Sequence, residues 1–519
     1  MLFNSYIFIF AFLPATLLFF YALQQKHLRW GLGWLILASL FYYGWARPQY
    51  IFLILSSIAV NYFFSIVIAR THHYKRIVLA LGLFLNVGLL GFLKYGSFVV
   101  RNFNALTGVA LPEPSFLLPL AISFFTFQQI AFLVDTFRRQ TSPCRFIDYC
   151  LFITFFPHLL SGPIVRCHET LPQFTEKDSR GFKHENLAVG MTLFTLGLFK
   201  KVLIADSLAR NATPVFLAVA QGAHLSFFEA WAGVLAYTFQ IYFDFSGYSD
   251  MAIGVARMFG VLLPLNFHSP YKARNLIDFW KRWHMTLSRF LRDYVYIPLG
   301  GNRKGRERQY LNIMITMLLC GLWHGAGWTF VVWGGLHGFF LVINHGWLLC
   351  KEKLITPRRT GCLWNEAFAR LITFLSVAVA WVFFRAEDMD SAFAMLYALT
   401  GAHGVVLPQS WLQPLGNVAP VFAWLNIQFL ETEYLSNGEY LYLLVLLGAV
   451  WFLPNTQEML RQAKPALDVH RYVAVRGSGR LERFFQWKPT VVWVTALSIL
   501  VLAALLSLQQ QSEFIYFQF

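Results

Sequence analysis

Two histidines in the central third of the chain, His284 and His324, have the surroundings that chemistry requires. His324 lies in GLWHGAGW, where glycines interrupt two apolar runs. Glycine permits a broken helix, and non-helical backbone at membrane depth is tolerated only where it lines a cavity or is buried in protein. We therefore expect His324 to face an internal space. Its imidazole can take a proton from an attacking hydroxyl near neutral pH, as acyl transfer from a thioester to an alcohol requires.

His284 lies in a segment, residues 278–302, that is too polar to cross a membrane and too apolar to be a loop. Five of its residues recur at the spacing of one helix face: Trp280, His284, Leu287, Leu291 and Tyr294. This spacing predicts one amphipathic helix that rests at the interface or dips into the protein interior. A second interpretation of His284, a buried histidine hydrogen-bonded to a neighbour, stays open.

Cations surround His284 in the sequence. Lys281, Arg282 and Arg289 are candidates for binding an anionic cytoplasmic donor, such as a phosphorylated cofactor, and a basic loop follows at residues 303–308. Such a cluster attracts anions. The bias of membrane proteins toward positive cytoplasmic loops explains the same residues without a ligand.

Other polar residues favour structural roles. His337 lies in WGGLHG, where glycine neighbours suit tight helix packing. We expect Asp244 and Asp250 where one spanning helix ends and a short one begins, holding backbone amides at a helix start. The sequence contains no GxSxG elbow, His-Glu-x-x-His zinc site or Walker loop, so we expect no metal site.

The composition predicts an all-α membrane protein. Of the 519 residues, 57% are apolar and 13% are charged, against about 25% charged in soluble domains. Long apolar stretches run over 3–23, 50–69, 77–100, 116–134, 227–243, 330–349, 371–384, 440–453 and 490–508. Shorter ones run over 30–46, 151–164, 187–204, 251–263 and 311–323. A span needs about 20 such residues, so we expect about 11 to 14 membrane helices and re-entrant segments.

The distribution of charge predicts the orientation. The net charge is +16, but the basic residues cluster in short loops, whereas residues 386–460 contain no Lys or Arg. Loops rich in Lys and Arg stay in the cytoplasm, so we expect the acidic loop and both termini outside and no nucleic-acid partner. We find no repeat or linker, which predicts one membrane domain over 1–519. Its functional core should be roughly 116–349, because ionisable groups interrupt the apolar runs there.

Five motifs identify a family. They are ISFFTFQQIAFLVDTFR from Ile122, FFPHLLSGPIVR from Phe155, YFDFSGYSDMAIG from Tyr242, FWKRWHMTLSRFLRDYVYIPLGGNRKG from Phe279 and GLWHGAGWTFVVWGGLHG from Gly321. The chain resembles the membrane-bound O-acyltransferase superfamily, in the bacterial branch typified by the alginate O-acetylation membrane protein. The resemblance implies a ring of helices around a thin central region with a funnel from the cytoplasm. It also implies that His324 occupies the catalytic position and that His284 is the second family histidine.

The resemblance further implies a function. An acetyl group, from acetyl-CoA as donor, passes across the bacterial inner membrane for O-acetylation of an exopolysaccharide such as alginate, together with a separate periplasmic SGNH-type acetyltransferase. His324 would act as general base while His284 orients the donor or stabilises the developing charge, and a transiently acylated histidine is a further route.

Several alternatives stay open. Peptidoglycan or cellulose can be the acceptor, and D-alanine from a carrier protein can be the transferred group. A transporter would also carry intramembrane polar residues, but the inverted repeats common in transporters are not found. A scaffold for polysaccharide export predicts that His324 can be replaced without effect.

Overall fold

The computed structural model describes the chain except for residues 72, 115–117, 142–143, 176–180, 355–362, 417–418, 425–426, 432–433, 435–436, 472–478, 509–514 and 516–519. Almost all of the described elements are helices. The described strands are β1 (Val405–Pro408) and β2 (Ile427–Leu430), which pair in parallel. The predicted all-α membrane fold is therefore confirmed.

The N-terminal third forms hairpins of apolar helices. Its elements are the π-helix η1 (Ile7–Phe12), α1 (Leu13–Lys26), α2 (Leu28–Gly44), α3 (Tyr50–Arg70), α4 (Lys75–Thr107) and α5 (Ile122–Phe137). The middle third contains α6 (Phe146–Thr154), α7 (Phe156–Leu159), α8 (Cys167–Thr175), α9 (His184–Phe199), the π-helix η3 (Lys200–Ala205), α10 (Asp206–Ala220), α11 (Phe227–Met258), α12 (Leu276–Trp280), α13 (Met285–Leu291), the π-helix η5 (Arg292–Tyr296), α14 (Arg306–His324) and α15 (Trp328–Leu354).

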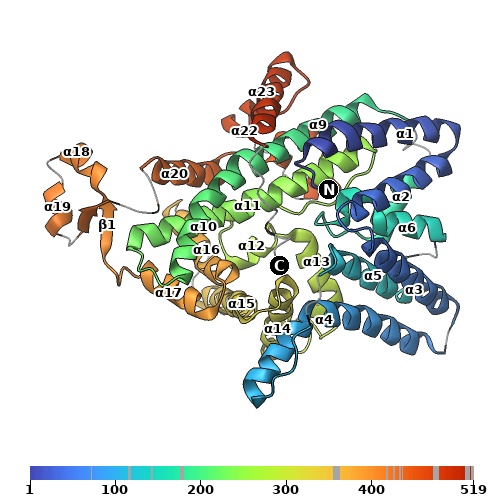
Figure 1. Ribbon diagram of the computed structural model, residues 1–519, viewed down its shortest axis with the longest axis horizontal. Helices are drawn as coiled ribbons and strands as arrows, with labels where there is room; N and C mark the ends of the chain where they lie inside the picture. Colours follow the sequence, from blue (N-terminus) through green and yellow to red (C-terminus); the bar gives the residue numbers. More distant parts are fainter. Residues whose placement is uncertain are drawn as a thin grey trace.

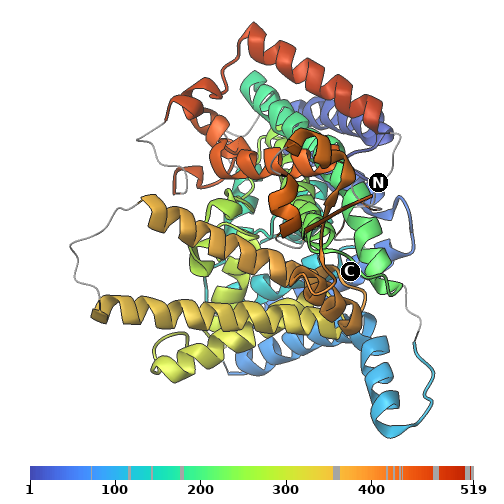
Figure 2. The same cartoon turned by 90° about the vertical axis from the view of Figure 1, so that its left-hand side faces the viewer.

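The last third begins with α16 (Leu363–Arg385), which lies beside α15 (Figures 1 and 2). It continues through α17 (Met389–Leu399), α18 (Leu412–Leu415), α19 (Ala419–Trp424), α20 (Asn437–Phe452), α21 (Thr456–Met459), α22 (Arg480–Phe484) and α23 (Val491–Ser507). The strands with α18 and α19 project from one side, whereas α12 and α13 lie near the middle with longer helices around them (Figure 1).

Several helices can cross a membrane by length and composition alone. In the described part of the chain there are five, at Ile7–Lys26, Tyr50–Arg70, Lys75–Thr107, His184–Ala220 and Asn365–Arg385. Four further apolar helices are shorter. The expected 11 to 14 membrane segments are thus reached only if shorter and more polar helices also enter the membrane. The funnel from the cytoplasm stays a prediction.

Small residues bring α9 and α11 into close contact. A Cβ atom on Gly254 would lie 2.6 Å from the carbonyl oxygen of Gly190, and one on Gly247 would lie 2.7 Å from that of Gly197. Backbones approach this closely only where side chains are absent, as is common between membrane helices. This interface fixes α11, the long buried helix behind the site.

The prediction for Asp244 and Asp250 is wrong. Both lie inside the continuous helix α11, not at a helix start. Asp250 pairs with Lys200 at 2.7 Å, and Asp244 pairs with Lys201 at 2.7 Å, both from the π-helix η3. These lysines neutralise the two carboxylates inside the protein. The helix can therefore continue through Asp244 and Asp250, where the sequence pattern predicts a helix end.

Candidate active site

The backbone is broken at His284. His284 has φ 42° and ψ 53°, in the left-handed region that non-glycine residues rarely adopt, and it separates α12 from α13. The prediction of one continuous helix through this segment is therefore wrong. The cause is non-local: the amide of Met285 donates to the carbonyl of Asn266 at 2.9 Å, and the amide of His268 donates to that of Arg282 at 2.9 Å. These hydrogen bonds supply partners, inside the protein, for backbone groups that the break in the helix leaves without an intrahelical partner.

The His284 side chain is fully buried. Its Nδ1 lies 3.0 Å from Oδ1 of Asn266. The ring of Phe245 packs edge-on against the imidazole at 4.8 Å between centroids. The hydrogen-bonded neighbour of the structural interpretation is thus present, and the site geometry decides whether His284 also does chemistry.

His324 is the last residue of α14, where the glycines end the helix. A Cβ on Gly321, inside α14, would lie 2.2 Å from the carbonyl oxygen of Phe330, so only glycine permits α15 to pack this closely against the end of α14. The His324 side chain is buried, and its ring centroid lies 5.1 Å from those of Trp333 and Phe384. Aromatic walls of this kind exclude water from the imidazole.

The fold brings the two histidines together. Their ring centroids are 6.4 Å apart, and Trp323 packs against both imidazoles. A direct hydrogen bond between two imidazoles requires centroids about 5 Å apart, so the rings do not bond each other. A single oxygen atom between them can lie within hydrogen-bond distance of both. The arrangement therefore suits a reaction at a group held between two imidazoles.

Lys94 and Tyr95 of α4 hold the end of α14, and neither residue was predicted to take part in the site. The Lys94 ammonium donates to the carbonyl oxygens of Trp323 at 2.5 Å and His324 at 3.0 Å. The Tyr95 hydroxyl donates to that of Leu322 at 2.5 Å. The last carbonyls of a helix have no partner within the helix and favour a cation. The available signal was that Lys94 is the single charged residue in the apolar run 77–100.

His337 lies in a different environment. Its fully buried ring packs against Trp333 at 4.8 Å and Trp280 at 5.2 Å between centroids. These contacts fit the structural role that the sequence favours. Among the described residues, no three His, Cys, Asp or Glu side chains lie close enough together to hold a metal ion.

The candidate donor-binding cations differ from one another. Arg289 makes a bidentate ion pair with Glu169 at 2.7 and 2.8 Å, and Arg282 pairs with Asp278 at 2.8 Å. Lys281 is exposed. An arginine that a carboxylate already neutralises attracts an anion weakly, so the geometry favours Lys281 and the exposed loop at 303–308 over the two arginines.

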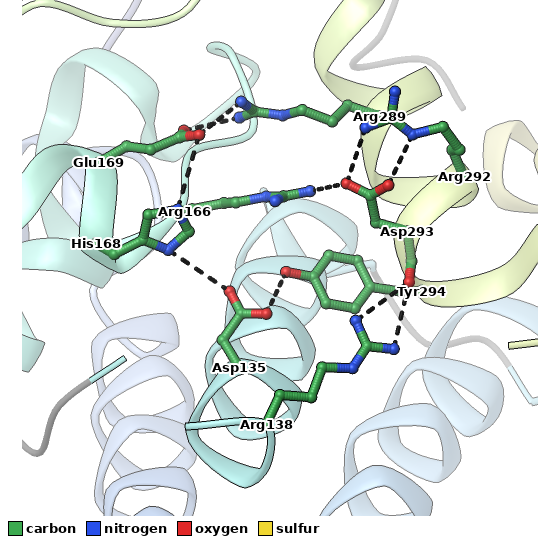
Figure 3. A network of polar contacts seen from close by, with 9 residues as sticks. All are labelled: Asp135, Arg138, Arg166, His168, Glu169, Arg289, Arg292, Asp293 and Tyr294. Atoms are coloured by element: carbon green, nitrogen blue, oxygen red, sulfur yellow. Dashed lines mark hydrogen bonds and ion pairs between the residues drawn. The ribbon is translucent and has the colours of Figure 1, made fainter. Parts of the chain in front are cut away.

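Arg289 belongs to a larger charged network (Figure 3). The Tyr294 hydroxyl donates to the carboxylate of Asp135 on α5 at 2.8 Å, and Arg166, which precedes α8, pairs with Asp293. The network thereby ties η5 and α13 to α5 and α8 (Figure 3). Since His284 directly precedes α13, the network restrains the position of His284 from the C-terminal side of the break.

Comparisons with known proteins agree with this arrangement. Residues 42–380 match the membrane-bound O-acyltransferase family. A peptidoglycan O-acetyltransferase of Helicobacter pylori is 44% identical over 78% of this chain and 81% of its own. A protein of Azotobacter vinelandii described as a probable alginate O-acetylase is 36% identical over the whole of both chains. A teichoic acid D-alanyltransferase of Streptococcus thermophilus is 30% identical over 51% of this chain and 68% of its own. The chain therefore belongs to the membrane-bound O-acyltransferase family and is a multi-pass membrane acyltransferase.

Proposed function

We propose that the protein transfers an acetyl group from cytoplasmic acetyl-CoA to a glycan on the other side of the membrane. The observation that carries the proposal is the buried pair His284 and His324, with 6.4 Å between ring centroids. We favour acetyl over D-alanyl as the transferred group, because the relatives that match most of this chain are named as an O-acetyltransferase and a probable O-acetylase. The relative named a D-alanyltransferase matches only 51% of the chain.

The positions of the basic residues support transfer across the membrane. From Arg306, in the exposed basic loop, α14 runs to His324 over about 27 Å, and α4 runs from Lys75 to Lys94 over about 28 Å, at 1.5 Å per residue. Both distances approach the roughly 30 Å of the hydrocarbon core. With the basic loops in the cytoplasm, His324 lies toward the outer side, where an external acceptor would arrive.

In the proposed reaction His324 is the general base. It removes the proton from the acceptor hydroxyl as the oxygen attacks the thioester carbonyl carbon, and the carbon–sulfur bond then breaks. The protonated imidazole returns the proton to the departing thiolate, so the enzyme ends unchanged. Where a periplasmic SGNH-type acetyltransferase supplies this acceptor hydroxyl, it would then carry the acetyl group onward to the glycan. An acylated His324 is the competing route, with the imidazole itself as nucleophile.

Two glycans compete as the final acceptor. Peptidoglycan is favoured by the higher identity to the relative of that name, 44%. An exopolysaccharide such as alginate is favoured by the full-length match at 36%. Supplying each polymer separately to the assay below distinguishes them.

The test is transfer of radiolabelled acetyl from acetyl-CoA in inverted membrane vesicles that enclose the periplasmic partner and the polymer. Wild type, His324→Ala and His284→Ala are compared, with His337→Phe as a matched loss of a buried histidine away from the pair. Label inside the vesicles should require His324 and should persist in His337→Phe. Retained transfer in His324→Ala would remove its assignment as base. No label in any variant, with the proteins folded, would favour a different donor or a transporter.

A further inference from the structure

We infer that Asn266 holds His284 in the tautomer with hydrogen on Nδ1, so that Nε2 presents a lone pair to the site. The inference rests on the proposed function only for its catalytic consequence. Asn266 is fully buried and lies in the segment that bonds to the backbone on both sides of the break. Its side chain contacts the Nδ1 atom of His284 at 3.0 Å.

The neighbours of Asn266 identify which of its amide atoms is the oxygen. The backbone amide of Thr286, which can only donate, lies 3.4 Å from that atom. The Thr286 hydroxyl, which accepts a hydrogen bond from the amide of Ile164 at 3.0 Å, has its own hydrogen left to donate to the same atom at 2.9 Å. On the other side, the amide nitrogen of Asn266 lies 3.3 Å from the hydroxyl of Ser249 on α11.

An amide oxygen only accepts, which fixes the proton on its partner. Because Oδ1 of Asn266 faces Nδ1 of His284, that nitrogen must be the donor. In a neutral imidazole the other nitrogen then carries the lone pair. The buried chain from Ile164 through Thr286 and Asn266 therefore determines the tautomer of His284, and the bonds around the break hold the ring in place.

This tautomer selects between the two roles open to His284. A neutral imidazole with its hydrogen already given to Asn266 cannot donate a hydrogen bond to the oxyanion that develops on the thioester carbonyl. It can accept one from a substrate N–H, such as an amide of the donor's pantetheine arm, or from a hydroxyl other than the attacking one, whose single hydrogen goes to His324. His284 thus orients a substrate group, and Asn266 and Thr286 are positioning residues.

The first experiment is solid-state nitrogen NMR of the full-length protein in bilayers with labelled histidine. The His284 signals are identified by their loss in His284→Gln. We expect a protonated Nδ1 and an unprotonated Nε2 in wild type, and mixed tautomers in Asn266→Leu. Asn86→Leu, which removes a buried amide of α4 bonded to Asn61, should leave the His284 signals unchanged. A protonated Nε2 in wild type would overturn the inference whether or not the protein transfers acetyl.

The second experiment measures acetyl transfer in Thr286→Val and Thr286→Ser. Valine keeps the shape but removes the hydroxyl that fixes the Asn266 amide, so kcat should fall about 10-fold or more with the variant normally folded. Serine restores the hydroxyl and should restore kcat. Equal rates in the two variants would show that the hydrogen-bond chain does not set the reactivity of His284. An inactive wild type would count against the proposed function and not against the tautomer.

Discussion

Replacing Lys94 by Met should weaken both the end of α14 and the reaction. The ammonium makes two hydrogen bonds, at 2.5 and 3.0 Å, to carbonyls of the last helical turn. Hydrogen bonds to charged groups contribute about 1.5–3 kcal/mol each, and methionine fills similar volume but donates none. We therefore expect a loss of at least about 3 kcal/mol of stability. Because these carbonyls belong to Trp323 and His324, a shift of about 1 Å in the helix end would lower kcat by about 100-fold.

The assay combines thermal unfolding of the purified protein in detergent with steady-state acetyl transfer in vesicles. Tyr95→Phe removes one neutral hydrogen bond to the same turn and should cost about 1 kcal/mol, with a smaller rate loss. Ser97→Ala is the matched control, because Ser97 of α4 bonds the carbonyl of Pro114 and not α14. Unchanged kcat in a folded Lys94→Met variant would refute the reasoning that α4 positions His324.

Two further predictions concern the framework. Glu169→Gln removes the carboxylate that holds Arg289 through two hydrogen bonds. We expect α13 to be held less firmly and kcat to fall. A rise in KM with unchanged kcat would instead indicate that Arg289 binds the donor. Gly254→Val forces a side chain to within 2.6 Å of the Gly190 carbonyl, and folded protein recovered from membranes should fall sharply. Gly448→Val on α20, where a Cβ meets nothing within 4 Å, should be recovered at the wild-type level, and equal recovery of both would contradict the packing argument.

The sequence predicts features that depend on local chemistry. Apolar runs indicate membrane helices because lipid leaves the backbone no other partner. The end of α14 at His324 follows from the glycines around it, and Gly325 directly after it takes an extended conformation that ends the helix. Both inferences need only the residues in question and a general property of the membrane or the backbone.

Features that depend on distant partners escaped prediction. The spacing around His284 fits a helix, yet backbone bonds from Asn266 and His268 impose a break there. Lys94 lies in a run that reads as an ordinary lipid-facing helix, and only the fold shows which carbonyls it serves. In each case the deciding contact joins segments far apart in the chain, which periodicity does not detect.

The two unpredicted features share one physical cause. Each candidate histidine stands where a helix is interrupted, and an interrupted helix inside a membrane protein exposes backbone groups that need partners. At His324 the partners are the side chains of Lys94 and Tyr95, and at His284 they are the backbone groups of Asn266 and His268. The residues that compensate the interruptions therefore also fix the backbone from which the two imidazoles project, and the side chain of Asn266 in addition contacts the His284 imidazole. Substitutions among them should impair the proposed reaction and the local backbone together, whereas replacement of His337 itself, whose imidazole lies outside the pair, should affect stability alone.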